Sequence, residues 1–154
     1  MSFSIHLQYG DPRWRKARGL SARLNAAADL ALRRGKARRN AGLTILLTGD
    51  AQLKSLNRDF RGKNKATNVL SFPASANKDV YLGDVALAFG VTEKEARTAG
   101  KRFADHAVHL VVHGVLHLLG FDHMRARDAG VMEPLESRIL AELGIADPYA
   151  AEAA

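Results

Sequence analysis

The chain contains no cysteine among its 154 residues. Disulfide bonds and thiolate metal sites are therefore excluded, and any metal ion has to be held by His, Asp or Glu. Aromatic residues make up only 6% of the chain, and no aromatic-rich stretch accompanies its basic residues. Aromatic stacking thus adds no support for a nucleic-acid interface.

Long apolar runs are also missing. The longest one, residues 107–119, is short for a bilayer and is broken by histidines. The first twelve residues lack the basic start and apolar block of a secretory signal. We therefore expect a cytoplasmic protein. The length, with 47% hydrophobic and 25% charged residues, predicts one domain over residues 1–154, with a disordered tail from about residue 146.

Acidic residues are scarce in the first part of the chain. Residues 1–66 hold 15 Lys and Arg against four Asp, whereas residues 67–154 hold 8 basic and 12 acidic residues. A basic half beside a mildly acidic half is compatible with a polyanionic substrate. On charge alone, an ordinary solvated surface is the favoured interpretation, because no aromatic-rich stretch accompanies the basic residues.

Hydrophobic periodicity predicts strands at 4–10, 43–49, 69–73 and 79–89. The mostly apolar strand at 43–49 is expected to be central. Helical spacing covers about 20–34, the segment after Asp50 as far as Phe60, a region up to 119 interrupted near Gly100, and 129–143. The fold class is therefore α+β, with a single mixed sheet of about four strands packed with about five helices.

Three local signals refine this prediction. Asp50 is a plausible N-cap for the helix that follows it. Thr92 and Glu95 have the spacing of a capping box, which would start a helix there. Gly83 interrupts a strand and indicates a bulge or a close backbone approach.

The stretch HGVLHLLGFDH, residues 113–123, carries three histidines among apolar residues. His113 and His117 are four apart on a predicted helix, so their side chains share a face at roughly 5–6 Å. Gly120 can take the left-handed conformation that ends a helix, and the turn would return His123 to the same metal ion. Three imidazole ligands with an open fourth position are typical of catalytic zinc.

Other polar residues near this stretch are harder to assign. His109 cannot join His113 and His117 at one metal ion, because His109 and His117 are displaced by about 12 Å along a helix. His109 is therefore expected to pack or to orient a ligand. His106 is expected to be an ordinary polar residue. The role of Asp122 stays open between supporting a ligand and lying in solvent.

The spacing matches the zinc helix of metzincin peptidases, H-E-x-x-H-x-x-G-x-x-H, except that Gly114 stands where those enzymes carry their glutamate base. Without that carboxylate, peptide hydrolysis lacks its base. We therefore expect a zincin-like metal helix without peptidase chemistry.

Three blocks together resemble the YbeY family of bacterial endoribonucleases, also called the rRNA maturation RNase family. They are FRGKNKATNVLSFP at 60–73, LGDVALA at 82–88 and HGVLHLLGFDH at 113–123. Their order and spacing match, and the similarity spans about residues 4–145.

This resemblance implies a zinc-dependent hydrolase of single-stranded RNA that acts in 16S rRNA 3′-end maturation, ribosome quality control and stress response. It implies one zinc ion held by His113, His117 and His123, with Arg61 as a functional arginine in the cleft and His113 and Arg61 as the catalytic residues. It also implies small-subunit ribosomal components and an associated GTPase as partners, and no DNA or membrane partner.

The chemistry of the residues agrees with this expectation. Arg61 can clamp a phosphate with two hydrogen bonds. Lys63 and Lys65 can hold neighbouring phosphates or lie in a solvated loop. Ser71 can line the cleft and contact RNA, or bond to the backbone as a strand residue. The nucleophile can be a zinc-activated hydroxide or the 2′-hydroxyl of the RNA.

The sequence leaves two alternatives open. One is a different metal-dependent hydrolase, although Gly114 counts against a peptidase. The other is a non-catalytic, ribosome-associated protein whose zinc is structural, which would require a fourth protein ligand.

Overall fold

A computed structural model describes residues 3–62, 67–74, 80–121 and 126–146, except for the side chains of residues 61 and 126–129. In chain order the elements are β1 (Ser4–Tyr9), the short 3-10 helix η1 (Pro12–Lys16), α1 (Leu20–Arg34), β2 (Gly42–Thr48), α2 (Asp50–Arg61), β3 (Val69–Pro73), β4 (Tyr81–Ala88), α3 (Phe89–Thr98), α4 (Phe103–Leu118) and α5 (Ala126–Glu142). The predicted α+β class, four strands and five α-helices are confirmed within the described residues. The tail beyond residue 146 lies outside them.

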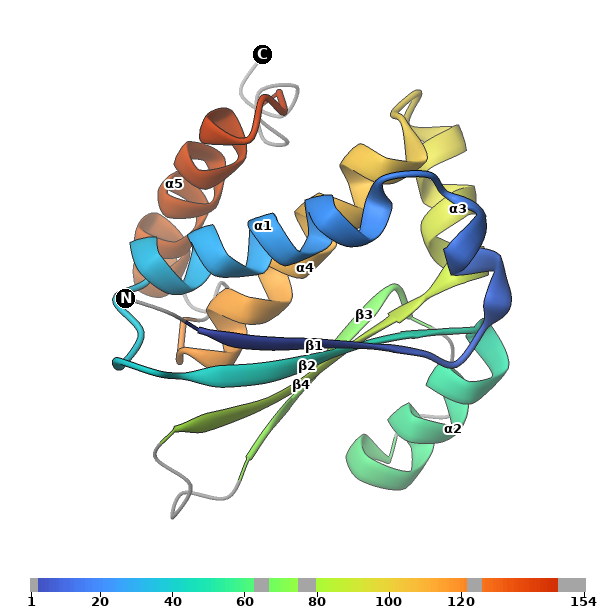
Figure 1. The fold of residues 1–154 in the computed structure, drawn as a ribbon, viewed down its shortest axis with the longest axis horizontal. Coiled ribbons are helices and arrows are strands. Elements are labelled where there is room, and N and C mark those ends of the chain that lie inside the picture. Colours follow the sequence, from blue (N-terminus) through green and yellow to red (C-terminus); the bar gives the residue numbers. More distant parts are fainter. Residues whose placement is uncertain (1–2, 63–66, 75–79, 122–125, 147–154) are drawn as a thin grey trace.

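The four strands form one mixed sheet in the order β1-β2-β4-β3 (Figure 1). β2 pairs in parallel with both β1 and β4, and β3 pairs antiparallel with β4. The central position predicted for the apolar strand at 43–49 is thus confirmed. No helix in the described residues is long and apolar enough to cross a membrane.

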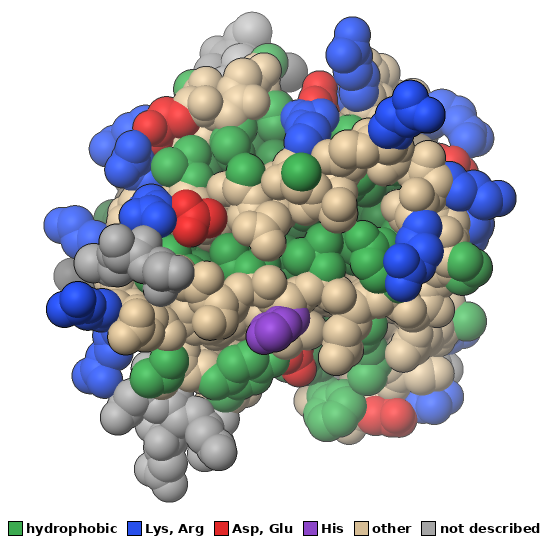
Figure 2. All heavy atoms as spheres, in the orientation of Figure 1, with side chains coloured by type: hydrophobic (Ala, Val, Ile, Leu, Met, Phe, Trp, Pro, Cys, Tyr) green, Lys and Arg blue, Asp and Glu red, His purple; other side chains and the backbone are tan. Residues whose placement is uncertain are grey.

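The helices cover the two faces of the sheet unequally. α1, α4 and α5 lie on one side, and α2 lies on the other (Figure 1). In the view of Figure 2, Lys and Arg side chains gather mostly toward the two ends of the molecule.

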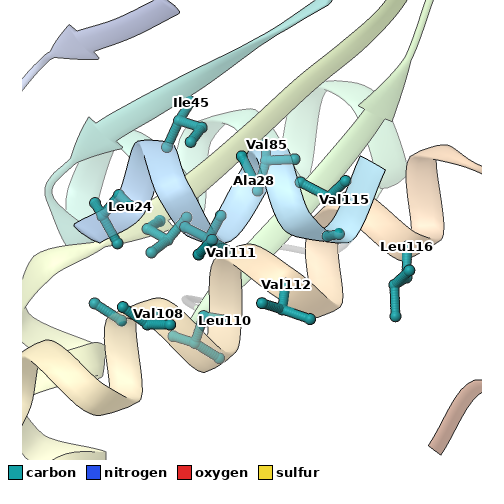
Figure 3. Close-up of a cluster of buried hydrophobic side chains, with 14 of the residues drawn as sticks. Leu24, Ala28, Ile45, Val85, Val108, Leu110, Val111, Val112, Val115 and Leu116 are labelled. Atoms are coloured by element: carbon teal, nitrogen blue, oxygen red, sulfur yellow. The ribbon is translucent and has the colours of Figure 1, made fainter. Parts of the chain in front are cut away.

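The main core lies between the sheet and the helix pair α1 and α4. Figure 3 shows Leu24 and Ala28 of α1 close to Val111 and Val115 of α4, with Ile45 of the sheet beside them. These side chains are fully buried. Small side chains along α1 let α4 pack closely across it, which holds α4 in a fixed position over the sheet.

The start of α3 differs from the sequence prediction. The helix begins at Phe89, so the predicted capping box is wrong: Thr92 lies inside the helix and donates a hydrogen bond from Oγ1 to the carbonyl of Ala88 (2.6 Å). Asp50, expected to cap its own helix, is instead the first residue of α2, whose N-cap is Gly49. The Asp50 carboxylate accepts the backbone N–H of Val91 (3.0 Å) and so caps α3.

Gly83 forms the predicted irregularity in β4. Gly42 pairs with Tyr81 and Leu43 pairs with Gly83, so one residue of β4 is skipped. Gly83 has a φ of +136°, and a Cβ there would lie 2.2 Å from the carbonyl oxygen of Phe72. Glycine is therefore required by both the backbone angle and the neighbouring strand.

Replacing Gly83 with alanine should therefore destabilise the fold by about 3 kcal/mol or more, because the strained φ and the clash with backbone add together. Gly100 also has a positive φ (+67°), but an added Cβ meets nothing within 4 Å. Gly100→Ala should cost only about 1–2 kcal/mol. Urea unfolding of both variants checks this, and equal losses would contradict the assigned clash.

Candidate metal centre

Helix α4 presents two different faces. One face carries apolar side chains that are buried against α1 and the sheet. The other carries His109, His113 and His117, which are spaced four apart and only partly buried. The helix thus uses its apolar residues to fix the position of the histidines.

The helix ends as the sequence predicts, at Gly120. Gly120 has a φ of +98°, its N–H bonds to the carbonyl of His117 (2.9 Å), and the N–H of Phe121 bonds to the carbonyl of Leu116 (3.0 Å). This pair of bonds is the Schellman pattern, which reverses the chain direction at a glycine.

His113 and His117 meet at their ring nitrogens. The two Nε2 atoms are 3.1 Å apart. Two unprotonated nitrogens repel each other at this distance, so either one of them carries a proton or a cation lies against both. In a tetrahedral zinc site with Zn–N bonds of about 2.0–2.1 Å, two ligand nitrogens are about 3.3 Å apart. The pair therefore fits a zinc ion with little movement.

Beside His113 lies a carboxylate that the sequence did not predict as part of the site. Glu136 of α5 is fully buried and contacts two histidines of α4: its Oε2 lies 2.6 Å from His109 Nε2, and its Oε1 lies 3.2 Å from His113 Nδ1. Burial alone would raise the pKa of Glu136, but the hydrogen bonds and charges of the two histidines outweigh it and lower the pKa to about 2. Glu136 is thus an anion held between two imidazoles.

This arrangement assigns the tautomer of His113. An ionised carboxylate can only accept, so Nδ1 of His113 must donate its proton to Glu136. The Nε2 lone pair of His113 is then free to point toward His117. A carboxylate behind a histidine is the usual way in which proteins orient an imidazole toward a metal ion.

The sequence did contain a signal for Glu136. It lies four residues after Met132 and three before Ile139, and both of these are buried on the inward face of α5. A carboxylate at an inward position of an amphipathic helix requires a buried partner. His109, expected to pack or to orient a ligand, is one of the two partners.

His106 forms a second pair one turn earlier on α4. Its Nε2 lies 2.9 Å from Glu95 Oε1, which also accepts a bond from Asn68 Nδ2 (3.0 Å). Burial lowers the pKa of His106 against the opposing effect of Glu95. These contacts fasten the start of β3 to α3 and α4, so His106 has a more definite structural role than the sequence suggested.

Ser71 and Gly114 fix the other side of α4. Ser71 Oγ donates to the carbonyl of Gly114 (2.9 Å), so of its two expected roles the bond to the backbone is present. A Cβ at Gly114 would lie 2.5 Å from Val85 Cγ1. The position at which metzincins carry their glutamate is therefore packed directly against the sheet.

The structure does not describe the side chains of several predicted site residues. Arg61 is the last residue of α2, but its side chain is not among those described, and Lys63, Lys65, Asp122 and His123 lie in the omitted ranges 63–66 and 122–125. Within the described residues, no three His, Asp or Glu side chains form a group suited to hold a metal ion. The third ligand and the phosphate-binding residues therefore stay predictions.

Comparisons with known proteins agree with the resemblance. A family model described as "Endoribonuclease YbeY" matches residues 12–144. Curated proteins of that name include one from Maricaulis maris, 45% identical over 95% of this chain and 91% of its own, and one from Ruegeria pomeroyi, 43% identical over 97% and 99%. The solution structure of TM1509 from Thermotoga maritima shares the fold, with a TM-score of 0.62 over 90% of this chain and 87% of that one at 24% identity.

The close approach of Gly114 to Val85 can be tested by substitution. Gly114→Ala should destabilise the protein by about 1–3 kcal/mol, because the added methyl group overlaps Val85. The same change made in a Val85→Ala background should cost clearly less. Urea unfolding of the two single variants and the double variant measures this coupling, and strictly additive losses would show that the methyl group does not meet Val85.

Proposed function

The chain belongs to the YbeY endoribonuclease family, and on this premise we propose that it is a zinc-dependent endoribonuclease that hydrolyses phosphodiester bonds of single-stranded RNA. The observation that carries the proposal is the pair of Nε2 atoms of His113 and His117, 3.1 Å apart, with the buried carboxylate of Glu136 behind one of them.

The proposed site holds one zinc ion per chain on His113, His117 and His123. When bound, zinc supplies a positive charge and lowers the pKa of water to about 7, so that no glutamate base is needed. The donor set suits this ion, because cysteine is absent and neutral imidazoles are common zinc ligands. Glu136 accepts the Nδ1 proton of His113, which leaves Nε2 as the nitrogen that would face the metal ion, and the two histidines keep Glu136 ionised.

The remaining proposed residues act on the RNA. Arg61 clamps the phosphate and stabilises charge that develops on its oxygens. Lys63 and Lys65 bind neighbouring phosphates. Ser71 holds α4 against β3 through the carbonyl of Gly114, next to His113, and so supports the position of the RNA beside the metal ion.

A peptidase is a poorer candidate. At Gly114 a Cβ would already overlap Val85, so the glutamate base of metzincins has no room at this position without a shift of the helix. Phosphodiester hydrolysis can proceed with the charge of a metal ion and of arginine instead.

The biological role that we propose follows the family resemblance. The enzyme would act in the cytoplasm on 16S rRNA during 3′-end maturation and ribosome quality control. Its partners would be small-subunit ribosomal components and an associated GTPase. The excess of basic residues in the first 66 residues suits an RNA substrate.

Purified protein should cleave single-stranded RNA, lose activity when a chelator removes its metal, and regain it with zinc. His113→Ala and Arg61→Ala should each reduce kcat/KM by at least about 100-fold, because the first removes a ligand of the metal ion and the second removes the charge that clamps the phosphate. Gel assays with end-labelled RNA measure this.

A mock purification and thermal melting of each variant serve as controls. Equal cleavage by wild type, both variants and the mock sample would identify a contaminating nuclease and contradict the proposal. Zinc without any RNA cleavage, and unfolding on its removal, would instead favour the non-catalytic alternative.

Glu136→Gln should weaken zinc binding by about 10–100-fold, because the amide no longer provides a charged acceptor for His113. Glu95→Gln is the matched control, since it removes the same charge from His106, which is not a proposed ligand. Competition with a coloured chelator measures both affinities, and melting of the metal-free proteins tests folding. Equal zinc affinity in both variants would contradict the role of Glu136.

A further inference from the structure

The turn after α1 carries a cluster of cations that the metal site does not use. We call residues 36–39 the basic turn. Lys36, Arg38 and Arg39 are all exposed there. The two arginines before the turn form ion pairs, Arg33 with Asp29 and Arg34 with Glu142, each at 2.7 Å. In the part of the chain that the structure describes, neither Lys36 nor Arg39 has a carboxylate within ion-pair distance.

Lys36 is held in an unusual backbone conformation. Its φ is +61°, in the left-handed region. The N–H of Lys36 bonds to the carbonyl of Arg33 (3.2 Å) and that of Ala37 to Leu32 (2.9 Å), which is the helix-ending pattern that normally places glycine at this position. Glycine would cost less free energy here than lysine. Strain of this kind is concentrated at functional sites.

Gly35, the residue just before the basic turn, lies against the end of the helix that carries the candidate ligands. A Cβ on Gly35 would lie 2.5 Å from Leu119 Cδ1 and 2.9 Å from the carbonyl of Ala31. Leu119 follows His117 by two residues. The C-terminal ends of α1 and α4 lie at the same end of the molecule (Figure 1), where Lys and Arg side chains also gather (Figure 2).

We propose that the basic turn binds phosphates of the single-stranded RNA whose cleaved bond lies at the candidate metal centre. This inference rests on the proposed function. The RNA strand continues from His117 over the end of α4, and Lys36, Arg38 and Arg39 neutralise the phosphates that it meets there. Arginine forms paired hydrogen bonds to a phosphate, whereas lysine acts as a compact charge.

The test compares two triple variants that lose the same charge. The first is Lys36→Gly, Arg38→Gln and Arg39→Gln. The control is Lys94→Gln, Arg97→Gln and Lys101→Gln, which removes three exposed cations on and after α3, near the N-terminal end of α4. Steady-state cleavage of an RNA of about 16 nucleotides, at salt concentrations between about 50 and 200 mM, gives KM and kcat/KM for each protein.

The basic-turn variant should show a raised KM and a weaker salt dependence. Each phosphate contact on a single strand contributes about 0.7 to the slope of log affinity against log salt, so the loss of three contacts lowers the slope by about 2. Between the two salt concentrations the drop in kcat/KM should then be roughly 20-fold smaller than in the wild type. The control should keep the wild-type slope, and RNA of about three nucleotides should respond much less.

Lys36→Gly alone separates RNA binding from folding. Its melting temperature should equal or exceed that of the wild type, because the left-handed strain is removed, while KM for the longer RNA should rise. A raised melting temperature with unchanged KM would overturn the role of Lys36. Equal changes of KM and slope in both triple variants, or no change in either, would overturn the proposal.

Absence of cleavage by the wild type would contradict the proposed function and not this inference. In that case, fluorescence anisotropy with a labelled RNA of the same length gives the dissociation constant and the salt slope of the wild type and of the two triple variants. The basic-turn variant should bind the RNA more weakly and with a lower slope than the other two proteins. Equal values for the two triple variants would overturn the proposal.

Discussion

Glu136 places an ionised carboxylate, fully shielded from solvent, between His109 and His113 of α4. A buried charge is stable only when it is paired and hydrogen-bonded, so this contact joins α5 to α4 at one defined position. It also determines which nitrogen of His113 carries a proton. The arrangement of the candidate metal centre, and therefore the chemistry proposed for it, depends on this contact between two consecutive helices.

The elements of the fold were predictable where the signal is local. The period of the apolar residues placed β2 at the centre of the sheet and α1 at its observed bounds, and glycine chemistry predicted the irregularity at Gly83 and the turn at Gly120. The start of α3 was not predictable in this way. Its N-terminus is capped by Asp50, which lies 41 residues earlier in the chain, so the local pattern of Thr92 and Glu95 indicated the wrong helix start.

The candidate site likewise combines a local feature, which the sequence predicts, with a tertiary contact, which the sequence does not predict. The spacing of His113 and His117 is a property of one helix and could be read from the sequence, whereas Glu136 belongs to another helix and could not be assigned a partner in advance. The contact of Gly35 with Leu119 is likewise tertiary. The sequence showed a carboxylate on an apolar face, but only the structure shows its partners, and only the structure shows that Lys36 takes a left-handed conformation.

Gly114 connects the packing with the reaction. A side chain at the position used by zinc peptidases would overlap Val85. In the proposed function the chemistry therefore comes from a metal ion, from Arg61 and from the histidines. X-ray absorption at the zinc edge of the purified, zinc-loaded protein tests this account most directly. The account predicts three imidazole nitrogens and one exchangeable oxygen from water. Four protein ligands, or a metal ion that stays bound with unchanged coordination after His113→Ala, would contradict it.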